Sequence, residues 1–209
     1  MRVEIDTHTH TLASGHAYNT MKLLYFKSSK EVSMNTRQKT TEFLKECLAD
    51  SLISLMKEKP LEDITITEIT SHSGVSRSTW FRNFHTKEEV LSFKLVVLWD
   101  RYCEARNRNK NIQIYLATVI DFFQFNLENR SLVELLYKQN LKNVIYDAFW
   151  IVMEQQYERS LFEVYQLRFY AHGVFGLLEE WLTRGCKESP EEMVDLFCRI
   201  LEERAAISN

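Results

Sequence analysis

The sequence has little glycine and proline, with 5 Gly and 2 Pro among 209 residues. Sandwiches and barrels made of short strands need frequent turns, and glycine and proline are the residues that form them most readily. Their scarcity therefore disfavours a turn-rich all-β fold and favours long helices. Long apolar runs are missing as well, and we expect no membrane partner because no run reaches the length that a bilayer requires.

Paired cysteines are also lacking. The four cysteines, Cys47, Cys103, Cys186 and Cys198, lie far apart and form no CxxC pair. Dense disulfide frameworks and cysteine-rich zinc sites need closer spacing. The pattern is typical of a protein of the reducing cytoplasm, and we expect no cofactor.

Acidic residues are absent from residues 74–87, although the whole chain has a net charge of −3. Residues 36–110 hold 13 Lys and Arg against 11 Asp and Glu, whereas residues 111–209 hold 9 against 15. The basic character is therefore local. This division favours a small docking module joined to an acidic body.

The basic stretch lies in a series of short helical patterns. Apolar residues at three- and four-residue spacing predict a helix over residues 37–58. Thr65 and Glu68 form a predicted capping box, Gly74 is the expected left-handed residue, and Ser76 caps the next helix. Helix, short glycine turn and second short helix form the helix-turn-helix pattern. Its expected core is Ile66, Ile69, Val75, Trp80, Phe81 and Phe84.

A helix that enters the major groove needs small polar or basic side chains near its N-terminus. Ser76, Arg77, Ser78 and Thr79 occupy that position, and Arg77 has the fork that suits a guanine edge. Arg82 and Lys87 are expected to contact phosphates at the flanks. Thr86 and Glu89 form a second predicted capping box, and the amide ends of the helices that begin near Thr65 and Thr86 are each expected to hold another phosphate. A capped helix pair with a solvated basic face remains the alternative.

The stretch "LADSLISLMKEKPLEDITITEITSHSGVSRSTWFRNFHTKEEVL", residues 48–91, resembles the DNA-binding region of TetR/AcrR-family transcriptional regulators. The resemblance implies an all-α homodimer whose helical body senses a small molecule. Mapped residue by residue, it implies contacts to a double-stranded DNA operator by Thr67, Arg77, Ser78, Thr79, Phe81, Arg82, Asn83 and Lys87. The family commonly has Tyr where Phe81 and Asn83 stand, so one hydroxyl is lost and another is replaced by an amide.

Residues 169–197 resemble the last two helices of the same family, and Ser189 to Glu192 form a further predicted capping box. The expected dimer interface comprises Gly173, Gly176, Leu177, Trp181, Met193 and Phe197. The alternative is that these residues complete the core of one subunit. The candidate lining of an effector pocket is Tyr115, Phe122, Tyr137, Phe149, Trp150 and Phe169, and the effector itself is unknown.

The first residues raise a separate question, because "VEIDTHTHTLASGHAYNT" resembles the first motif of PHP-type metal-dependent phosphoesterases. The resemblance implies metal ligands at His8, His10 and His16. Further ligands from that barrel do not follow in the sequence, so we expect neither a metal site nor an enzyme. Residues 1–33 are interpreted as an extra, poorly ordered segment.

The resulting expectation is an all-α protein of three parts: the extra segment 1–33, a helix-turn-helix domain at 34–85, and a helical-bundle domain for ligand sensing and dimerisation at 86–209. The predicted function is a ligand-responsive repressor that binds a palindromic operator as a dimer. Two alternatives are kept. One is a phosphoesterase-like hydrolase, and the other is a helical interaction module that has lost DNA binding.

Overall fold

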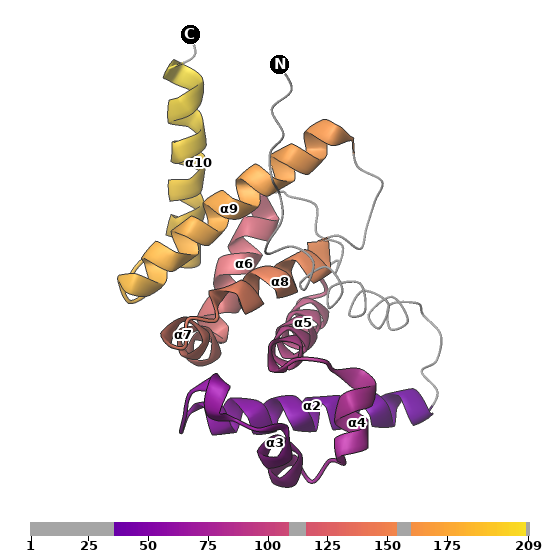
Figure 1. Ribbon diagram of the computed structural model, residues 1–209. Helices are drawn as coiled ribbons and strands as arrows, with labels where there is room; N and C mark the ends of the chain where they lie inside the picture. The colour runs from indigo at the N-terminus through magenta and orange to yellow at the C-terminus, as the bar shows by residue number, and fades with distance from the viewer. Residues whose placement is uncertain (1–35, 109–115, 154–159, 208–209) are drawn as a thin grey trace, which may run out of the picture. The chain divides into compact units, whose positions relative to one another are not determined.

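The computed structural model describes residues 36–108, 116–153 and 160–207 (Figure 1). Every regular element within these ranges is a helix, which confirms the all-α prediction. The elements are α2 (Thr36–Met56), η1 (Leu61–Asp63), α3 (Ile66–Ser73), α4 (Arg77–Asn83), α5 (Lys87–Ala105), α6 (Leu116–Glu128), α7 (Arg130–Lys138), α8 (Lys142–Met153), α9 (Leu161–Thr183) and α10 (Pro190–Ile207). No described helix combines the length and apolarity that crossing a bilayer requires.

The chain divides into two compact units. Of the described residues, the first unit comprises 36–96 together with Asp147–Ile151 of α8, and the second comprises Val97–Tyr146 and the chain from Val152 onward. The first unit thus continues past residue 85, where the sequence suggested a domain boundary, to Val96. The N-terminal half of α5 is part of it, and the buried Phe93 of α5 contacts Phe84 there.

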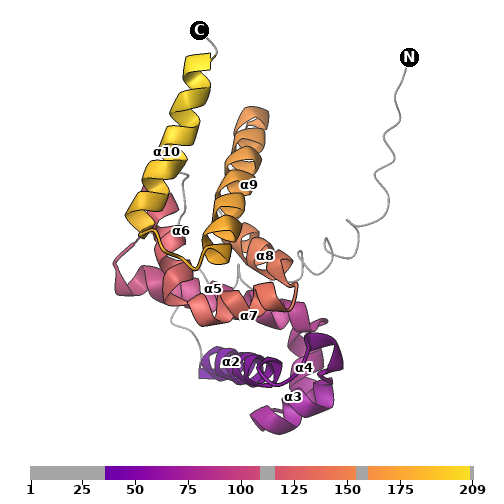
Figure 2. The same cartoon turned by 90° about the vertical axis from the view of Figure 1, so that its left-hand side faces the viewer.

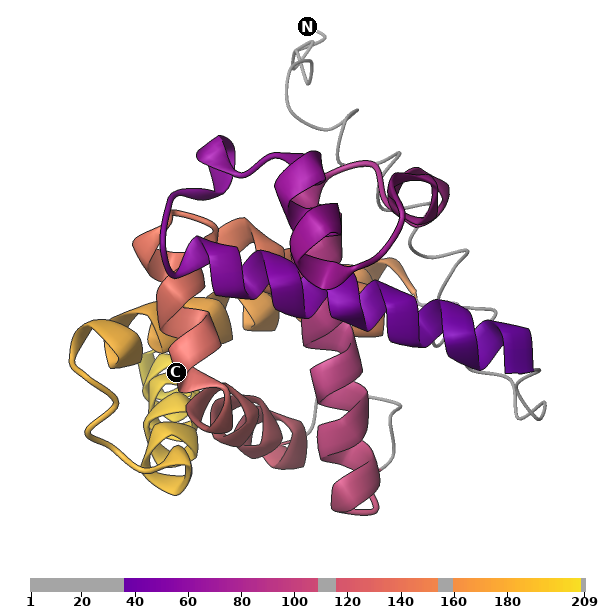
Figure 3. The same cartoon turned by 90° about the horizontal axis from the view of Figure 1, so that it is seen from below.

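Local hydrogen bonds set the helix boundaries in the first unit. The Thr65 side chain accepts a hydrogen bond from the Glu68 N–H, and the Glu68 carboxylate accepts one from the Thr65 N–H, so the predicted capping box is present. Gly74 ends α3 with a φ of +68°, a backbone conformation that other residues rarely adopt. Figure 3 shows α2, in indigo, as the longest helix of this unit, and α3 and α4 both pack against it.

The start of α5 differs slightly from the expected second capping box. The Thr86 hydroxyl accepts a hydrogen bond from the Glu89 N–H at 3.1 Å, as predicted. The Glu89 carboxylate, however, accepts from the N–H of His85 at 2.7 Å, one residue before Thr86. The reciprocal bond therefore closes a slightly larger loop and still satisfies a backbone donor at the helix entrance.

The core of the first unit is built around Trp80 of α4 and Phe84, which directly follows the helix. Both side chains are buried, and their ring centroids are 5.9 Å apart. Phe84 also contacts Phe93 of α5 edge to face at 5.7 Å. Burying a large apolar side chain of this kind contributes about 1.5–3 kcal/mol. Phe81 was expected in this core, but its side chain is 57% exposed.

The second unit is centred on α6, which packs against α7 and α10. The centroid of Phe123 on α6 lies 5.4 Å from that of Trp181 on α9, with the rings perpendicular. The buried stripe of α9 consists of Leu167, Ala171, Val174, Leu178 and Trp181. Figure 1 shows α9 and α10 crossing at an angle, and Figure 2 shows the loop that joins their lower ends.

All four tryptophans of the chain are buried. Trp80 belongs to the first unit, and Trp150 lies on the part of α8 assigned to that unit. Trp99 and Trp181 belong to the second unit, where Trp99 stacks on Tyr102 at 5.4 Å. Indole rings of this size dominate the apolar burial in a small domain.

Candidate nucleic-acid interface

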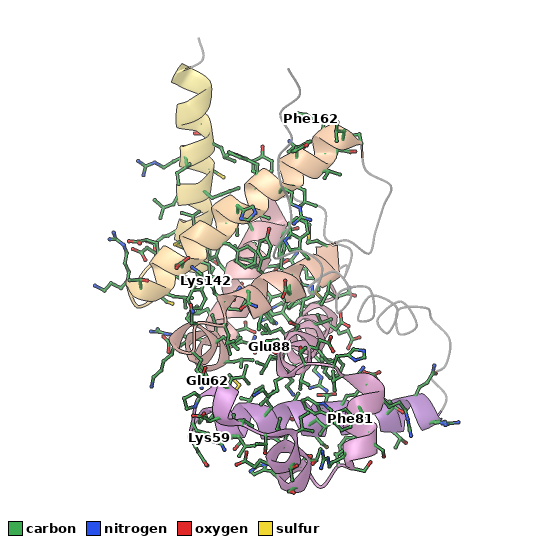
Figure 4. The ribbon with its side chains drawn as sticks, viewed as in Figure 1. Lys59, Glu62, Phe81, Glu88, Lys142 and Phe162 are labelled. Carbon is green, nitrogen blue, oxygen red and sulfur yellow. The ribbon has the colours of Figure 1, made fainter. Side chains whose placement is uncertain are left out.

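The outer surface of α4 carries two basic side chains and no acidic one. Arg77, Ser78, Phe81 and Arg82 are exposed along this seven-residue helix. Figure 4 labels Phe81 on α4. Because Trp80 and Phe84 anchor the opposite side of the helix in the core, the exposed side is held in a fixed orientation within its unit. This arrangement presents cations, a hydroxyl and an aromatic ring together.

A small hydroxyl cluster precedes this surface. The Ser76 Oγ accepts a hydrogen bond from the Thr79 N–H at 3.2 Å, which caps α4 as predicted. The same oxygen lies 2.9 Å from the Ser78 hydroxyl and 2.9 Å from the Thr79 hydroxyl. Each hydroxyl has one proton and two lone pairs, so the cluster retains hydrogen-bonding capacity for a further polar group.

Arg77 and Phe81 lie next to each other on α4. The guanidinium carbon of Arg77 is 6.0 Å from the centroid of the Phe81 ring. Residues four apart share one face of a helix, so both side chains present their outer ends to the same region. The distance is at the outer limit of a cation–π contact, which at an exposed site contributes about 0.5–1 kcal/mol.

Asn83 differs from its expected role as a DNA contact. Its side chain is 9% exposed, and its Nδ2 donates a hydrogen bond of 2.7 Å to the carbonyl oxygen of Thr79. The amide is thus directed along its own helix and stabilises the last turn of α4. Burial excludes Asn83 from the outer surface, and we omit it from the proposed contacts.

Lys87 also has a different partner from the expected phosphate. Its ammonium donates hydrogen bonds to the backbone carbonyls of Leu61, of Glu62 at 3.4 Å and of Ile64 at 2.9 Å. An ammonium has three N–H groups, and three carbonyl acceptors occupy them all. Lys87 therefore joins α5 to the segment around η1, and it is also omitted from the proposed contacts.

Thr65 and Thr67 flank the start of α3, and both are exposed. Thr65 is occupied by the capping box, in which its hydroxyl donates to Glu68 at 2.8 Å. The Lys59 ammonium donates to the same carboxylate at 2.5 Å. These bonds, that of Lys59 first and the Thr65 N–H second, lower the pKa of Glu68 to about 2. An ionised Glu68 beside Thr65 disfavours a phosphate there, whereas Thr67 remains a candidate contact.

The six residues expected at a dimer interface fall into two groups. Trp181, Met193 and Phe197 are buried within the single chain, where they complete the core of the second unit. Gly173 and Gly176 are exposed, and Leu177 is half-buried. A Cβ added at either glycine would meet no atom within 4 Å. The second group leaves surface for a partner helix, and Phe197 of the first group, although buried, lines a cavity between α9 and α10 with Gly173 and Leu177.

A cavity of about 630 Å³ lies between α9 and α10. Its lining includes Gly173 and Leu177, together with Tyr165, Phe169 and Ile200. Exposed apolar side chains continue from it toward the N-terminal end of α9, where Figure 4 labels Phe162. Phe162 is 74% exposed. The side of α9 opposite its buried stripe is thus also apolar, a feature typical of a protein–protein contact.

The residues expected to line an effector pocket are divided between the two units: Phe122, Tyr137 and Phe169 lie in the second, and Phe149 and Trp150 in the first. Phe169 lines the cavity between α9 and α10, and Phe122 packs against Phe175 at 5.3 Å. Phe149 and Trp150 contact each other on α8 at 5.5 Å. Burial and the nearby Glu179 raise the pKa of Tyr137 to about 12. Tyr115 lies outside the described residues.

The candidate metal ligands His8, His10 and His16 also lie outside the described residues. Within the described part of the chain, no three His, Cys, Asp or Glu side chains gather in a way that could hold a metal ion.

The lining of the cavity between α9 and α10 includes one residue that was not expected there from the sequence. Arg168 of α9 lines the cavity beside Tyr165 of α9 and Ile200 of α10. The sequence indicates this surface by a second apolar repeat on α9. Tyr165, Phe169 and Gly173 recur at four-residue spacing and form a repeat separate from the buried one.

The comparison with known families bears on the second unit. Residues 115–203 match the family TetR_C_8, transcriptional regulator C-terminal region. This match supports a TetR-family transcriptional regulator. It covers the acidic body and not the helix-turn-helix, so it is independent of the resemblance found at residues 48–91. Among curated proteins, none is similar enough to the chain to count as a match.

Proposed function

We propose that the protein is a dimeric, sequence-specific DNA-binding repressor whose α4 enters the major groove. The observation that carries the proposal is the outer surface of α4, where Arg77, Ser78 and Arg82 are exposed on a helix without acidic residues. The regulator-type second unit supports the same role. Effector binding in the second unit is proposed to release the operator, in keeping with regulators of this family.

Electrostatics supports this use of α4. Duplex DNA carries a phosphate charge about every 1.7 Å along its axis, so a docking surface gains from cations and loses from carboxylates. Arg77 lies at the first position of α4 and suits direct contact with guanine, whereas Arg82 near its end suits a phosphate. Ser78 and Thr79 are short enough to let the helix approach base edges. The proposed contacts are Thr67, Ser76, Arg77, Ser78, Thr79, Phe81 and Arg82.

Selection from a random duplex pool tests the proposal. We expect the full chain to enrich a palindrome with half-sites about one helical turn apart. Arg77→Ala should relax one base position, with a loss of about 1–3 kcal/mol for the preferred base. Lys138→Ala removes an exposed cation in the second unit and serves as the control. Failure to enrich any sequence, with parent and Arg77→Ala binding equally weakly, would show that DNA reading is not the function.

The dimer is proposed to form on the apolar surface of α9 and α10. Gly173 and Gly176 allow the backbone of a second helix to come close, and the exposed rings of Tyr165 and Phe169 flank them. A second copy of the chain can fill the cavity between these helices with its own copies of these side chains. Such a self-complementary contact is the commonest form of homodimer and gives the two-fold symmetry that a palindrome requires.

A further inference from the structure

We propose that Arg77 and Phe81 act as a pair that reads two neighbouring base pairs, with Arg77 on a guanine and Phe81 on the 5-methyl group of a thymine. The inference rests on the proposed function, because it needs α4 to enter the major groove. It adds to that function by naming two neighbouring base pairs of the operator. It also assigns the recognition of an apolar group on one of them to Phe81.

The first observation is the exposure of Phe81. Its ring is 57% exposed, while the neighbouring Trp80 is completely buried. Successive residues of a helix point about 100° apart, so the orientation that buries Trp80 and Phe84 leaves Phe81 outside. The residues beside it on the outer surface are Ser78 and Arg82, which are polar. Phe81 is thus an isolated apolar group in the middle of a polar, basic surface.

The second observation is the chemistry of the ring. A phenylalanine has no hydroxyl, so it can donate no hydrogen bond to a phosphate or to a base. In the major groove, the thymine 5-methyl group is the apolar feature that distinguishes one base from the others, and phenylalanine is among the side chains that contact it. Contact with that methyl removes apolar surface of both partners from water.

The third observation is the distance between the two side chains. The Arg77 guanidinium carbon lies 6.0 Å from the Phe81 ring centroid, and the two residues share one face of α4. Stacked bases on one strand are about 3.4 Å apart. Side chains this close, projecting from one face, reach neighbouring base pairs rather than distant ones. Arg77 in its forked geometry binds O6 and N7 of a guanine. Phe81 then contacts the methyl group of a thymine in the neighbouring base pair.

Base analogues provide the test, because they change one atom or group and leave pairing intact. Uracil replaces each thymine of the selected operator in turn, which removes only the methyl. We expect one position per half-site to lose about fourfold in affinity for the parent, the value of one buried methyl group. In Phe81→Ala the same replacement should have no effect. Phe81→Leu, which keeps an apolar side chain, should retain part of the sensitivity.

A second analogue tests the partner residue. Replacing the adjacent guanine with 7-deazaguanine removes the N7 acceptor, and Arg77→Ala should abolish the effect of that replacement. Circular dichroism checks that each variant remains helical. One outcome is an operator in which replacing thymine by uracil lowers the affinity of the parent and of Phe81→Ala equally at every position. In that case the methyl readout is wrong and the proposed function stands. If no operator is selected, both fail together.

Discussion

Lys87 Nζ donates a hydrogen bond of 2.9 Å to the carbonyl oxygen of Ile64, which lies 23 residues earlier in the chain. The same ammonium binds the carbonyl of Leu61, within η1. A single charged group thus binds carbonyls of η1 and of the residue that follows it, including the Leu61 carbonyl that also accepts from the Ile64 N–H. It also fixes the first turn of α5 against the segment that leads into α3.

The main effect of replacing Lys87 with Met should therefore be on the stability of the fold. The effect on the charge that DNA meets should be smaller. Lys87→Met keeps most of the aliphatic stem and removes the hydrogen bonds, at a cost of about 1–3 kcal/mol in the free energy of unfolding. Urea denaturation measures the loss. Lys57→Met, an exposed lysine of the same unit, should change the stability by less than about 0.5 kcal/mol. Equal effects of the two substitutions would contradict the assignment.

Arg82 is the expected phosphate contact on α4. In Arg82→Ala the slope of log affinity against log salt concentration should become less steep by about 1.8 for the proposed dimer, about 0.9 per subunit, because each subunit makes one fewer phosphate contact. The preference among bases should be unchanged, since a phosphate contact carries no sequence information directly. Fluorescence anisotropy at four salt concentrations gives the slope. Lys138→Ala, which removes the same charge from the second unit, should leave the slope unaltered.

Stability of the first unit should depend on Glu68 in acid. The pKa of Glu68 is lowered from 4.5 to about 2 by the hydrogen bonds from Lys59 and Thr65. A lowered pKa means that the unfolded chain binds the proton more readily, so the contribution of Glu68 is complete above about pH 5 and is lost as the pH falls toward 2. In urea denaturation at pH 6 and pH 3, the parent should lose more stability than Glu68→Gln.

A matched control for this effect is Glu58→Gln, which removes an exposed carboxylate from the turn after α2. Its acid dependence should follow that of the parent. If Glu68→Gln and Glu58→Gln gave the same change between pH 6 and pH 3, the capping box would not be the source of the acid sensitivity.

Gly173 should be essential for association and dispensable for folding. Beyond its own helical turn, no atom of the described residues lies within 4 Å of a Cβ added there, and a helical glycine costs about 0.5–1 kcal/mol relative to alanine. Gly173→Gln should thus keep or raise the melting temperature while its side chain obstructs a second helix. Sedimentation velocity should show the parent as a dimer and Gly173→Gln shifted to monomer.

Gly176→Ala is the milder control, because one methyl group obstructs a partner far less than a glutamine side chain does. It should weaken the dimer less than Gly173→Gln. A parent that sediments as a monomer at tens of micromolar would refute the dimer, and an undiminished dimer in Gly173→Gln would place it on another surface.

Local features of the fold were predictable from the sequence because they depend on residues close together in the chain. The Thr65–Glu68 box, the left-handed Gly74, the Ser76 cap and the Ser189–Glu192 box each need only three or four neighbouring residues. Their hydrogen bonds are similar in any protein that contains the motif. These motifs located the helix starts and ends to within about two residues.

Features that depend on distant contacts were not predictable in the same way. Trp80 and Phe81 are both aromatic and were both expected in the core, but in the fold Trp80 is buried with Phe84, which contacts Phe93 of α5, and Phe81 is exposed. The binding of Lys87 to the Ile64 carbonyl spans 23 residues. Likewise, the sequence left open whether Trp181 lies in a core or at an interface. Its contact with Phe123 of another helix places it in the core. The proposed base contacts remain predictions.

The burial of all four indole rings has a spectroscopic consequence. Trp80, Trp99, Trp150 and Trp181 each expose less than a tenth of their surface, and none of them lies on the outer surface of α4. Their emission in the native protein should be blue-shifted and poorly quenched by iodide. It should move to longer wavelength only when the chain unfolds. Intrinsic fluorescence should therefore follow unfolding of the parent and its variants with little signal from duplex binding, which needs a label on the DNA.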